Sequence, residues 1–159
     1  MTSTTAEVRD EVTGLALGLP PGWERVEAPG FPIAIAGPAG QAAADGTTFR
    51  PNVTVTVAPA DAAADIRTLG TEALAAATAV ADGAHVLAYD LWAVGDAEGR
   101  RLVAVHQQGP IPLTVTQVVV LAHGAVTTAT ATCGVAQLPE AGPLLDQALA
   151  GLVPGTVNR

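Results

Sequence analysis

Alternating apolar and polar residues run through much of this chain and predict that most of it forms β-strands. Three strands are expected first, within residues 12–19, 31–38 and 52–59. The third, "NVTVTVAP", is the clearest, because its valines would point to one side of the strand and its threonines to the other. A turn at Pro20-Pro21-Gly22 separates the first two strands, and we expect Trp23 after it to close one end of the core.

Four more strand-like segments follow in the second half of the chain. They are "HVLAYDLWAV", "RRLVAVHQQ", "PLTVTQVVVLA" and "AVTTATATC", and only "GDAEG", "GPIP" and "HG" separate them. Connections this short join antiparallel neighbours, since a parallel crossover needs about a dozen residues or more. The sequence therefore predicts a four-stranded meander.

Two segments have the 3.6-residue period of helices. The first follows Asp61, a candidate N-cap, and ends at Gly83. The second has Pro139 in its first turn and stops at Pro154-Gly155. The apolar stripe of the first helix comprises Ile66, Leu69, Ala73, Ala76 and Val80, and that of the second comprises Leu144, Leu145, Ala148, Leu149 and Leu152.

These elements predict an α+β fold in which a largely antiparallel sheet of about six to seven strands carries helices on its faces. The run "VTQVVVL" is apolar on both sides of its strand, so we expect the two helices to cover opposite faces. Residues 11–155 would form a single domain. Residues 1–10 are polar and lack an apolar period, which predicts a disordered tail.

The charge of the chain excludes two classes of partner. It has no lysine, seven arginines and fifteen acids, and a formal net charge of -8. A nucleic-acid backbone and an anionic membrane surface would both be repelled. The sequence shows neither a signal-peptide pattern nor a lipid-anchor cysteine, and its longest apolar run, "VVVLA", suits a buried strand. We therefore expect a cytoplasmic location.

Four motifs, "LPPGWERV", "FRPNVTVTV", "LTVTQVVVL" and "TTATATC", occur in this order. Together they resemble the LpqN-type proteins of actinobacteria, within the wider PsbP-like and Ran-binding Mog superfamily, over about residues 12–153. The resemblance implies an α/β/α sandwich around an antiparallel sheet. It also implies a binding or accessory role, as a subunit of a larger assembly or a chaperone-like adaptor, with no settled catalytic activity. The sequence departs from LpqN-type lipoproteins in showing neither a signal peptide nor an acylated cysteine, which puts their surface-lipoprotein role in doubt here.

Candidate chemistry is sparse. The three histidines have no chelating spacing, although His106 and His123 could meet across adjacent strands. Cys133 has no base or cation near it in the sequence and is expected to be a buried thiol. The lone serine, Ser3, lies in the predicted tail. We therefore predict no catalytic residue, no metal site and no cofactor, and we expect that the protein is not an enzyme.

A few side chains are candidates for contact with a protein or peptide partner. Tryptophan is enriched at binding hot spots, which makes Trp92 a candidate, although packing in the core is the favoured alternative for it. Amide and threonine side chains would form a polar, concave surface wherever a helix leaves the sheet open. Alternation puts Asp90 on the side of Trp92 or of solvent, so we expect either an exposed edge position or a salt bridge to Arg100 or Arg101 across the hairpin. Arg50 could bind a carboxylate, although "RPN" is better explained as the start of a strand. The candidate partner-binding residues are Trp92, Arg50, Asn52, Gln107 and Gln117.

Three functional hypotheses remain. The first is a non-enzymatic binding or accessory domain. The second is a small-ligand carrier, or an enzyme, with an apolar pocket between a helix and the sheet, because the alanine-rich helix containing Gly70 could shift. The third is self-association, for example as a homodimer, because a sheet of seven strands has edges and the chain carries few charges.

Overall fold

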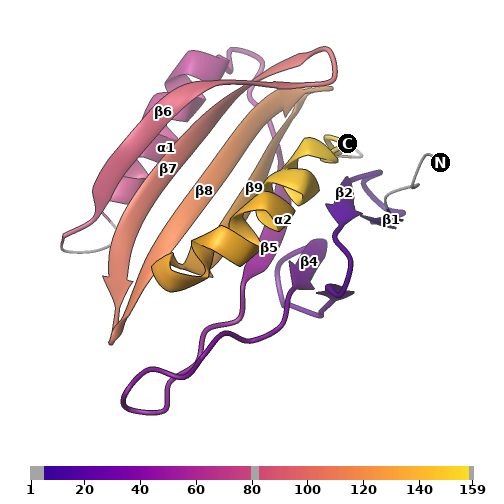
Figure 1. Cartoon of the computed structure of the whole chain (residues 1–159). Coiled ribbons are helices and arrows are strands. Elements are labelled where there is room, and N and C mark those ends of the chain that lie inside the picture. Colours follow the sequence, from indigo (N-terminus) through magenta and orange to yellow (C-terminus); the bar gives the residue numbers. More distant parts are fainter. Residues whose placement is uncertain (1–5, 80–82, 158–159) are drawn as a thin grey trace.

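A computed structural model describes residues 6–79 and 83–157 of the chain (Figure 1). Its main element is a sheet of seven antiparallel strands in the order β3-β4-β5-β9-β8-β7-β6, accompanied by a two-stranded sheet of β1 and β2. The strands are β1 (Ala6–Arg9), β2 (Ala16–Leu19), β3 (Glu24–Arg25), β4 (Ile33–Ala36), β5 (Asn52–Pro59), β6 (His85–Val94), β7 (Ala97–Gln108), β8 (Ile111–Ala122) and β9 (Ala125–Gly134). The helices are α1 (Ile66–Ala79), the short 3-10 helix η1 (Val135–Gln137) and α2 (Leu138–Ala150).

The predicted meander is confirmed. Strands β6 to β9 pair in chain order, and β9 then pairs with β5 over eight residue pairs from Asn52↔Thr132 to Pro59↔Ala125. The turn between β8 and β9 consists of His123 and Gly124, both with positive φ (54° and 71°), as tight hairpins require. The predicted fold class, an antiparallel sheet with helices packed on it, is therefore correct.

The N-terminal segment differs from the prediction. Residues 1–5 of the expected tail lie outside the described residues, but Ala6–Arg9 form β1 and pair with β2 in a register that sets Val8 opposite Leu17. Val8 is 8% exposed and belongs to the core. A four-residue strand with one buried side chain has too little alternation to be recognised in a sequence. The pairing also places the first predicted strand outside the main sheet.

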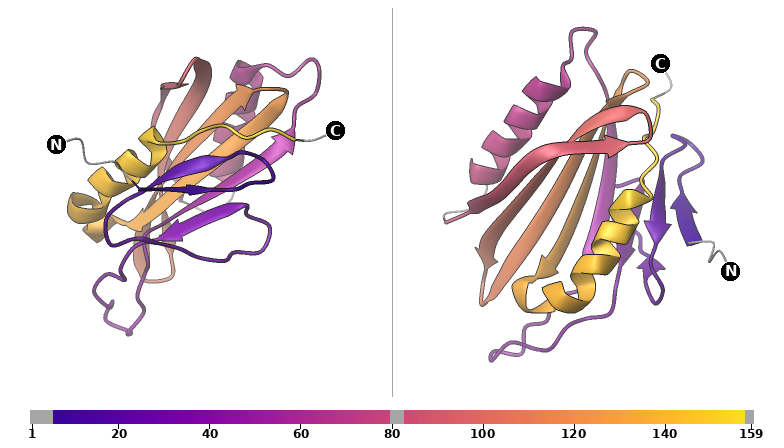
Figure 2. Two further views of the ribbon diagram at one scale, coloured as in Figure 1. Left: turned by 90° about the vertical axis from the view of Figure 1, so that its right-hand side faces the viewer. Right: turned by 45° about the horizontal axis from the view of Figure 1, so that its top comes forward.

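The helices lie on opposite faces of the main sheet, as predicted (Figure 2). Helix α1 packs on β7, β8 and β6, whereas α2 packs on β9 and β5 and against β2. The N-cap of α1 is Asp65 rather than the predicted Asp61. Its carboxylate accepts bonds from the backbone N–H and the hydroxyl of Thr68, at 3.2 and 3.3 Å. Val80, predicted for the apolar stripe of α1, lies outside the described residues.

The main core lies between α2, β2 and the part of the sheet around β4, β5 and β9. Trp23 is 6% exposed and closes one end of it, as expected. Its indole lies so close to Gly37 that a Cβ there would be 2.6 Å from Trp23 Cε2, so this position excludes any side chain. The largest fully buried apolar side chains include Leu15, Leu17, Ile33, Ile35, Val53, Val55, Val118 and Leu149.

Candidate binding face on the open part of the sheet

Helix α2 covers only part of its side of the main sheet (Figure 1). Its packing contacts there are with β9 and β5, and it also packs against β2 of the small sheet. The same side of β6, β7 and the adjoining part of β8 therefore lacks a covering helix among the described residues. Strand register identifies the side chains there, since directly paired residues share a face. Asp90 pairs with Arg101, Trp92 with Gly99, and Val103 with both Ala88 and Thr116. We call the residues Ala88, Asp90, Trp92, Arg101, Val103 and Thr116 the open face.

A three-residue cluster forms one part of the open face. The Arg101 guanidinium donates to both carboxylate oxygens of Asp90, from Nε to Oδ1 at 3.0 Å and from Nη2 to Oδ2 at 2.6 Å. The same guanidinium carbon lies 4.8 Å from the centre of the Trp92 ring. The predicted salt bridge is thus confirmed, with Arg101 as the partner. A planar guanidinium can bind a carboxylate in this bidentate way while stacking on an aromatic ring.

The cluster is partly accessible to solvent, and each of its two charges stabilises the ionised form of the other. The side chains of Arg101 and Asp90 are 28% and 44% exposed, and Trp92 is half-buried against the edge of the core. Hydrogen bonds from Arg101 hold the pKa of Asp90 below its ordinary value. Asp90, and more weakly Asp146 of α2, raise the pKa of Arg101. The pair therefore stays ionised across the physiological pH range and acts as a fixed polar group beside an aromatic surface.

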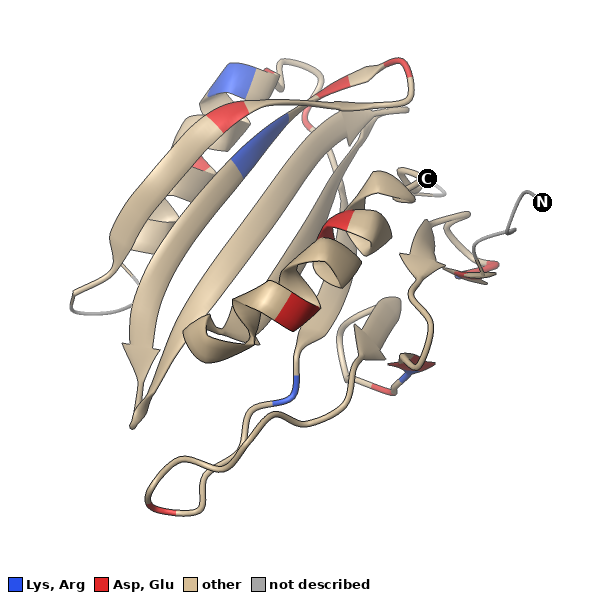
Figure 3. Ribbon diagram, viewed as in Figure 1, with Lys and Arg blue, Asp and Glu red and all other residues tan. Residues whose placement is uncertain are grey.

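Small, uncharged side chains surround the cluster. Ala88, Val103 and Thr116 are all half-buried, and their short side chains lie on the same face as Trp92. Figure 3 shows few charged residues over this part of the sheet, with acidic residues on the neighbouring helix α2. Partly exposed tryptophan and arginine side chains among small, mostly apolar residues are typical of binding hot spots.

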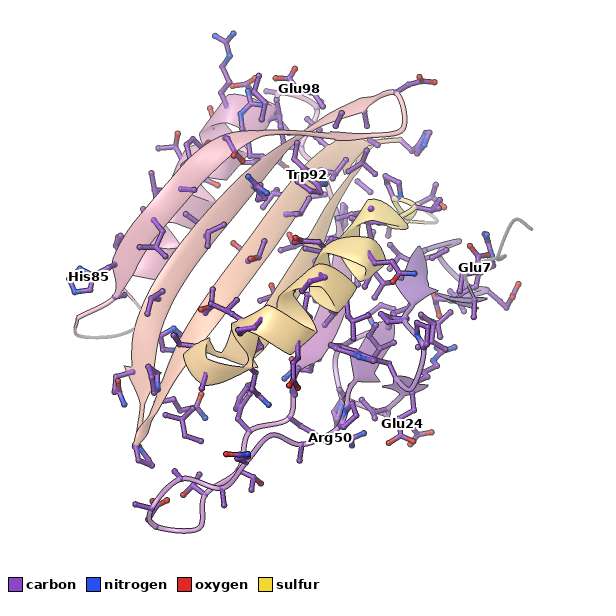
Figure 4. All side chains as sticks on the ribbon, in the orientation of Figure 1. Glu7, Glu24, Arg50, His85, Trp92 and Glu98 are labelled. Atoms are coloured by element: carbon purple, nitrogen blue, oxygen red, sulfur yellow. The ribbon has the colours of Figure 1, made fainter. Side chains whose placement is uncertain are left out.

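The five predicted partner-binding residues do not gather in one place. Trp92 lies on the open face, and Figure 4 shows it far from Arg50. Gln107 alternates onto the same face as Val103, but at the end of the hairpin, where its amide donates to Gly109 O at 2.9 Å. Gln117 pairs with Leu102 on the opposite face and donates to Thr130 Oγ1 at 3.3 Å.

The "RPN" triplet makes local structural contacts. This agrees with the prediction that it starts a strand. Arg50 Nε donates to Gly37 O at 2.8 Å, and its guanidinium forms an exposed ion pair with Glu24 (Figure 4). Asn52 donates to Arg50 O at 3.0 Å where β5 begins. Arg50 thus ties the start of β5 to β3 and to the end of β4.

The expectation that His106 and His123 could meet is wrong. His106 pairs with Leu113 near one end of the β7–β8 hairpin, whereas His123 lies in the turn at the far end of β8. Cys133 is fully buried, and burial raises the pKa of its thiol from 9.0 to about 11. Within residues 6–79 and 83–157, no three His, Cys, Asp or Glu side chains are grouped as metal ligands.

Hollows also lie elsewhere on the molecule. A cavity of about 180 Å³ lies between part of α1 and the sheet, where the pocket between helix and sheet was expected. It is lined by Ala73, Ala76, Ala77, Ala84, Leu102, Ala104, His106, Val115 and Gln117. A wider groove of about 610 Å³ lies between residues 38–43, the hairpin at residues 110–112 and the start of α2. Sequence reasoning missed this groove, because its walls are loops far apart in the chain.

Comparison with known proteins shows similarity at the level of structure. No family model and no curated protein matches the chain. LpqN of Mycobacterium tuberculosis, described as involved in cell envelope biogenesis, superposes with a TM-score of 0.70 at 15% identity, over 95% of this chain and 91% of LpqN. The cyanobacterial PsbP of Synechocystis gives 0.62 at 12% identity, over 96% and 94% of the two chains. The Ran-binding protein Mog1p of Saccharomyces cerevisiae gives 0.61 at 10% identity, over 94% and 95%.

These structures are similar over almost their whole lengths, which matches the resemblance found in the motifs. None of the helices in the described residues is long and apolar enough to span a membrane. The chain thus has the fold shared by LpqN, the cyanobacterial PsbP and Mog1p, an antiparallel sheet with helices on both faces.

Proposed function

We propose that this protein is a non-enzymatic binding or accessory domain whose open face contacts a protein or peptide partner. The observation that carries the proposal is the uncovered part of the sheet beside α2, where Trp92 and Arg101 are stacked and partly accessible. Helix α1 covers the opposite face of the same strands, so a partner on the open face would complete a layer on both sides of the sheet.

The chemistry of the described residues also favours binding over reaction. Cys133 is buried with a raised pKa, and His106 and His123 lie near opposite ends of β8. A nucleophile needs a base within hydrogen-bonding distance, and neither arrangement provides one. Mog1p, which has this fold, is a Ran-binding protein, so the fold can support contact with another protein.

The proposal is tested by capturing partners on the immobilised full chain from an extract of the cells that express it, then measuring the affinity of the purified partner. We expect Trp92→Ala and Arg101→Glu each to weaken binding at least about tenfold, because hot-spot residues contribute about 2 kcal/mol or more. Arg101→Glu serves as the second variant because Trp92 also packs on the core.

Val12→Ala is the matched control, since Val12 is 76% exposed and does not belong to the open face. Equal binding by all variants would place the partner elsewhere and contradict the proposal. Turnover of a small molecule that is lost when one residue of the open face is changed would overturn its non-enzymatic part.

The cavity under α1 favours a second candidate function, the carriage of a small apolar ligand. Its walls are mainly alanine and valine side chains, and the two polar groups, His106 and Gln117, could orient one hydrogen-bonding end of a ligand. A thermal-shift series with indole, phenol and short-chain alcohols tests it. Ala76→Leu, which would fill the cavity, should abolish any shift, and a flat response of the unaltered protein would contradict the idea.

A further inference from the structure

The two edges of the main sheet differ sharply. One edge is β3, which has two residues, both charged, and is followed by Pro29 and Pro32. The other edge is β6, which has ten residues and pairs only with β7. Its outer backbone N–H and C=O groups have no strand beside them among the described residues. Short, charged and proline-flanked edges resist pairing with another chain, whereas long apolar edges invite it.

Exposed apolar side chains concentrate on β6. Of the nine large hydrophobic residues exposed in the described parts of the chain, four lie in this one strand: Val86 at 36%, Leu87 at 64%, Tyr89 at 39% and Leu91 at 68% exposure. The strand contains neither lysine nor proline, the residues that commonly block an edge. An apolar row along an unpaired backbone edge is a self-association site.

We propose that β6 pairs antiparallel with β6 of a second copy, so that the two main sheets become one continuous sheet. The proposal goes beyond the function proposed above and stands on a different observation, the edge of the sheet rather than its open face. A two-fold axis is expected, because the same strand supplies both sides of the contact.

The register of β6 indicates where the axis lies. A β-bulge at Leu87 interrupts the pairing with β7, so the regular part of the strand is Ala88–Val94. Its midpoint is Leu91, the most exposed large apolar residue of β6. Pairing about this point sets Leu91 opposite Leu91 of the second copy, and Tyr89 opposite Ala93 of the second copy.

The charges of the strand are compatible with a second copy. Asp90 is the single acid of β6, and Arg101 of the same chain already neutralises it. In the proposed register, Asp90 lies opposite Trp92 of the second copy, whose ring is stacked with the Arg101 guanidinium of that copy. Each acid would therefore meet an aromatic and cationic group rather than another acid, despite the net charge of -8.

Sedimentation equilibrium of the full chain tests the proposal. We expect a mass twice the 15.8 kDa of one chain at about 100 μM, well above a Kd in the micromolar range. Leu91→Lys should weaken association at least about tenfold, because a charge would be buried in the paired edge. Val12→Lys, at an exposed position outside β6, should leave it unchanged. A monomer at this concentration, or a dimer that withstands Leu91→Lys, overturns the proposal.

A second variant locates the contact independently. Cys133 is fully buried, so Leu91→Cys introduces the single accessible thiol of the described residues. Directly opposed Cβ atoms in an antiparallel pair lie about 4.5–5.5 Å apart, close enough for oxidation or a short bis-maleimide to link them. Crosslinked dimer from Leu91→Cys but not from Val12→Cys supports the register, and equal yields contradict it.

Because Leu91 pairs with Arg100, on the side of the sheet opposite the open face, Leu91→Lys leaves Trp92 and Arg101 in place. Loss of dimers with retained partner binding in Leu91→Lys would therefore separate the two proposals.

Discussion

At the scale of single residues, burial decides which side chains are available for chemistry. Cys133 is completely enclosed and keeps its proton to a pKa of about 11, whereas Asp90 and Arg101 are partly exposed and remain charged. The thiol is therefore available only for packing, whereas the ion pair is accessible to a partner. Sequence alternation alone assigned Asp90 to the side of Trp92, because side chains in a strand repeat every two residues.

The raised pKa of Cys133 predicts a pH dependence of stability. The folded protein holds the thiol proton up to about pH 11, while the unfolded chain releases it near pH 9.0, so the unfolding free energy should fall as pH rises between these values. The slope should be at most about 1.4 kcal/mol per pH unit, measured by urea unfolding against Cys133→Ala, which lacks the titrating group. Parallel curves for the two proteins would contradict this prediction.

At the scale of secondary-structure elements, the meander was predictable and the ends of elements were not. Breaks such as "GDAEG" and "HG" are too short for anything but antiparallel pairing, so β6 to β9 followed from the sequence. Asp61 and Asp65 both resemble N-caps, because each precedes a run compatible with a helix. Only the structure distinguishes them, through the bonds from Thr68 to Asp65.

The capping contacts predict that Asp65→Ala destabilises α1 and Asp61→Ala does not. Loss of the Asp65 carboxylate leaves the Thr68 N–H without its partner, which should cost about 0.5–2 kcal/mol in urea unfolding. Asp61 contributes its backbone oxygen to Ala64, a bond that survives the substitution to Ala. A larger loss from Asp61→Ala than from Asp65→Ala would show that α1 begins earlier.

At the scale of the whole molecule, the segment after α2 joins the small sheet to the large one. Val153 exchanges backbone bonds with Ala16 of β2, and Gly155 N–H donates to Thr127 Oγ1 of β9 at 3.1 Å. Thr127 is 1% exposed, so water cannot replace it readily as the acceptor. The two sheets are thus held together by hydrogen bonds as well as by the core.

Thr127→Val should therefore cost about 1–3 kcal/mol of unfolding free energy, because it leaves the buried Gly155 N–H unsatisfied. The matched control is Thr128→Val, one residue along the same strand on the opposite face, where a half-exposed site predicts a change within about 0.5 kcal/mol. Hydrogen exchange at the Gly155 amide should accelerate only in Thr127→Val. Equal costs for the two variants would argue against a specific role for this bond.

The candidate site was the least predictable part of the molecule, for a physical reason. Alternation divides each strand into two faces but does not reveal which face a helix leaves uncovered. Trp92 and Gln117 were therefore grouped as candidates, although they lie on opposite faces of the sheet. Which part of a face stays uncovered depends on how far α2 extends across β9 and β5. That extent is set by packing between segments distant in the sequence.

The position of β9 between β5 and β8 also affects when the main sheet can assemble during synthesis of the chain. Among the described residues, the early strands β3 to β5 connect to the later strands β6 to β8 of the sheet only through β9, which ends at Gly134. During synthesis, both groups must wait for this strand to leave the ribosome before they can join. Nascent chains are therefore expected to remain incompletely folded, with apolar strand edges available to chaperones, until β9 has been synthesised.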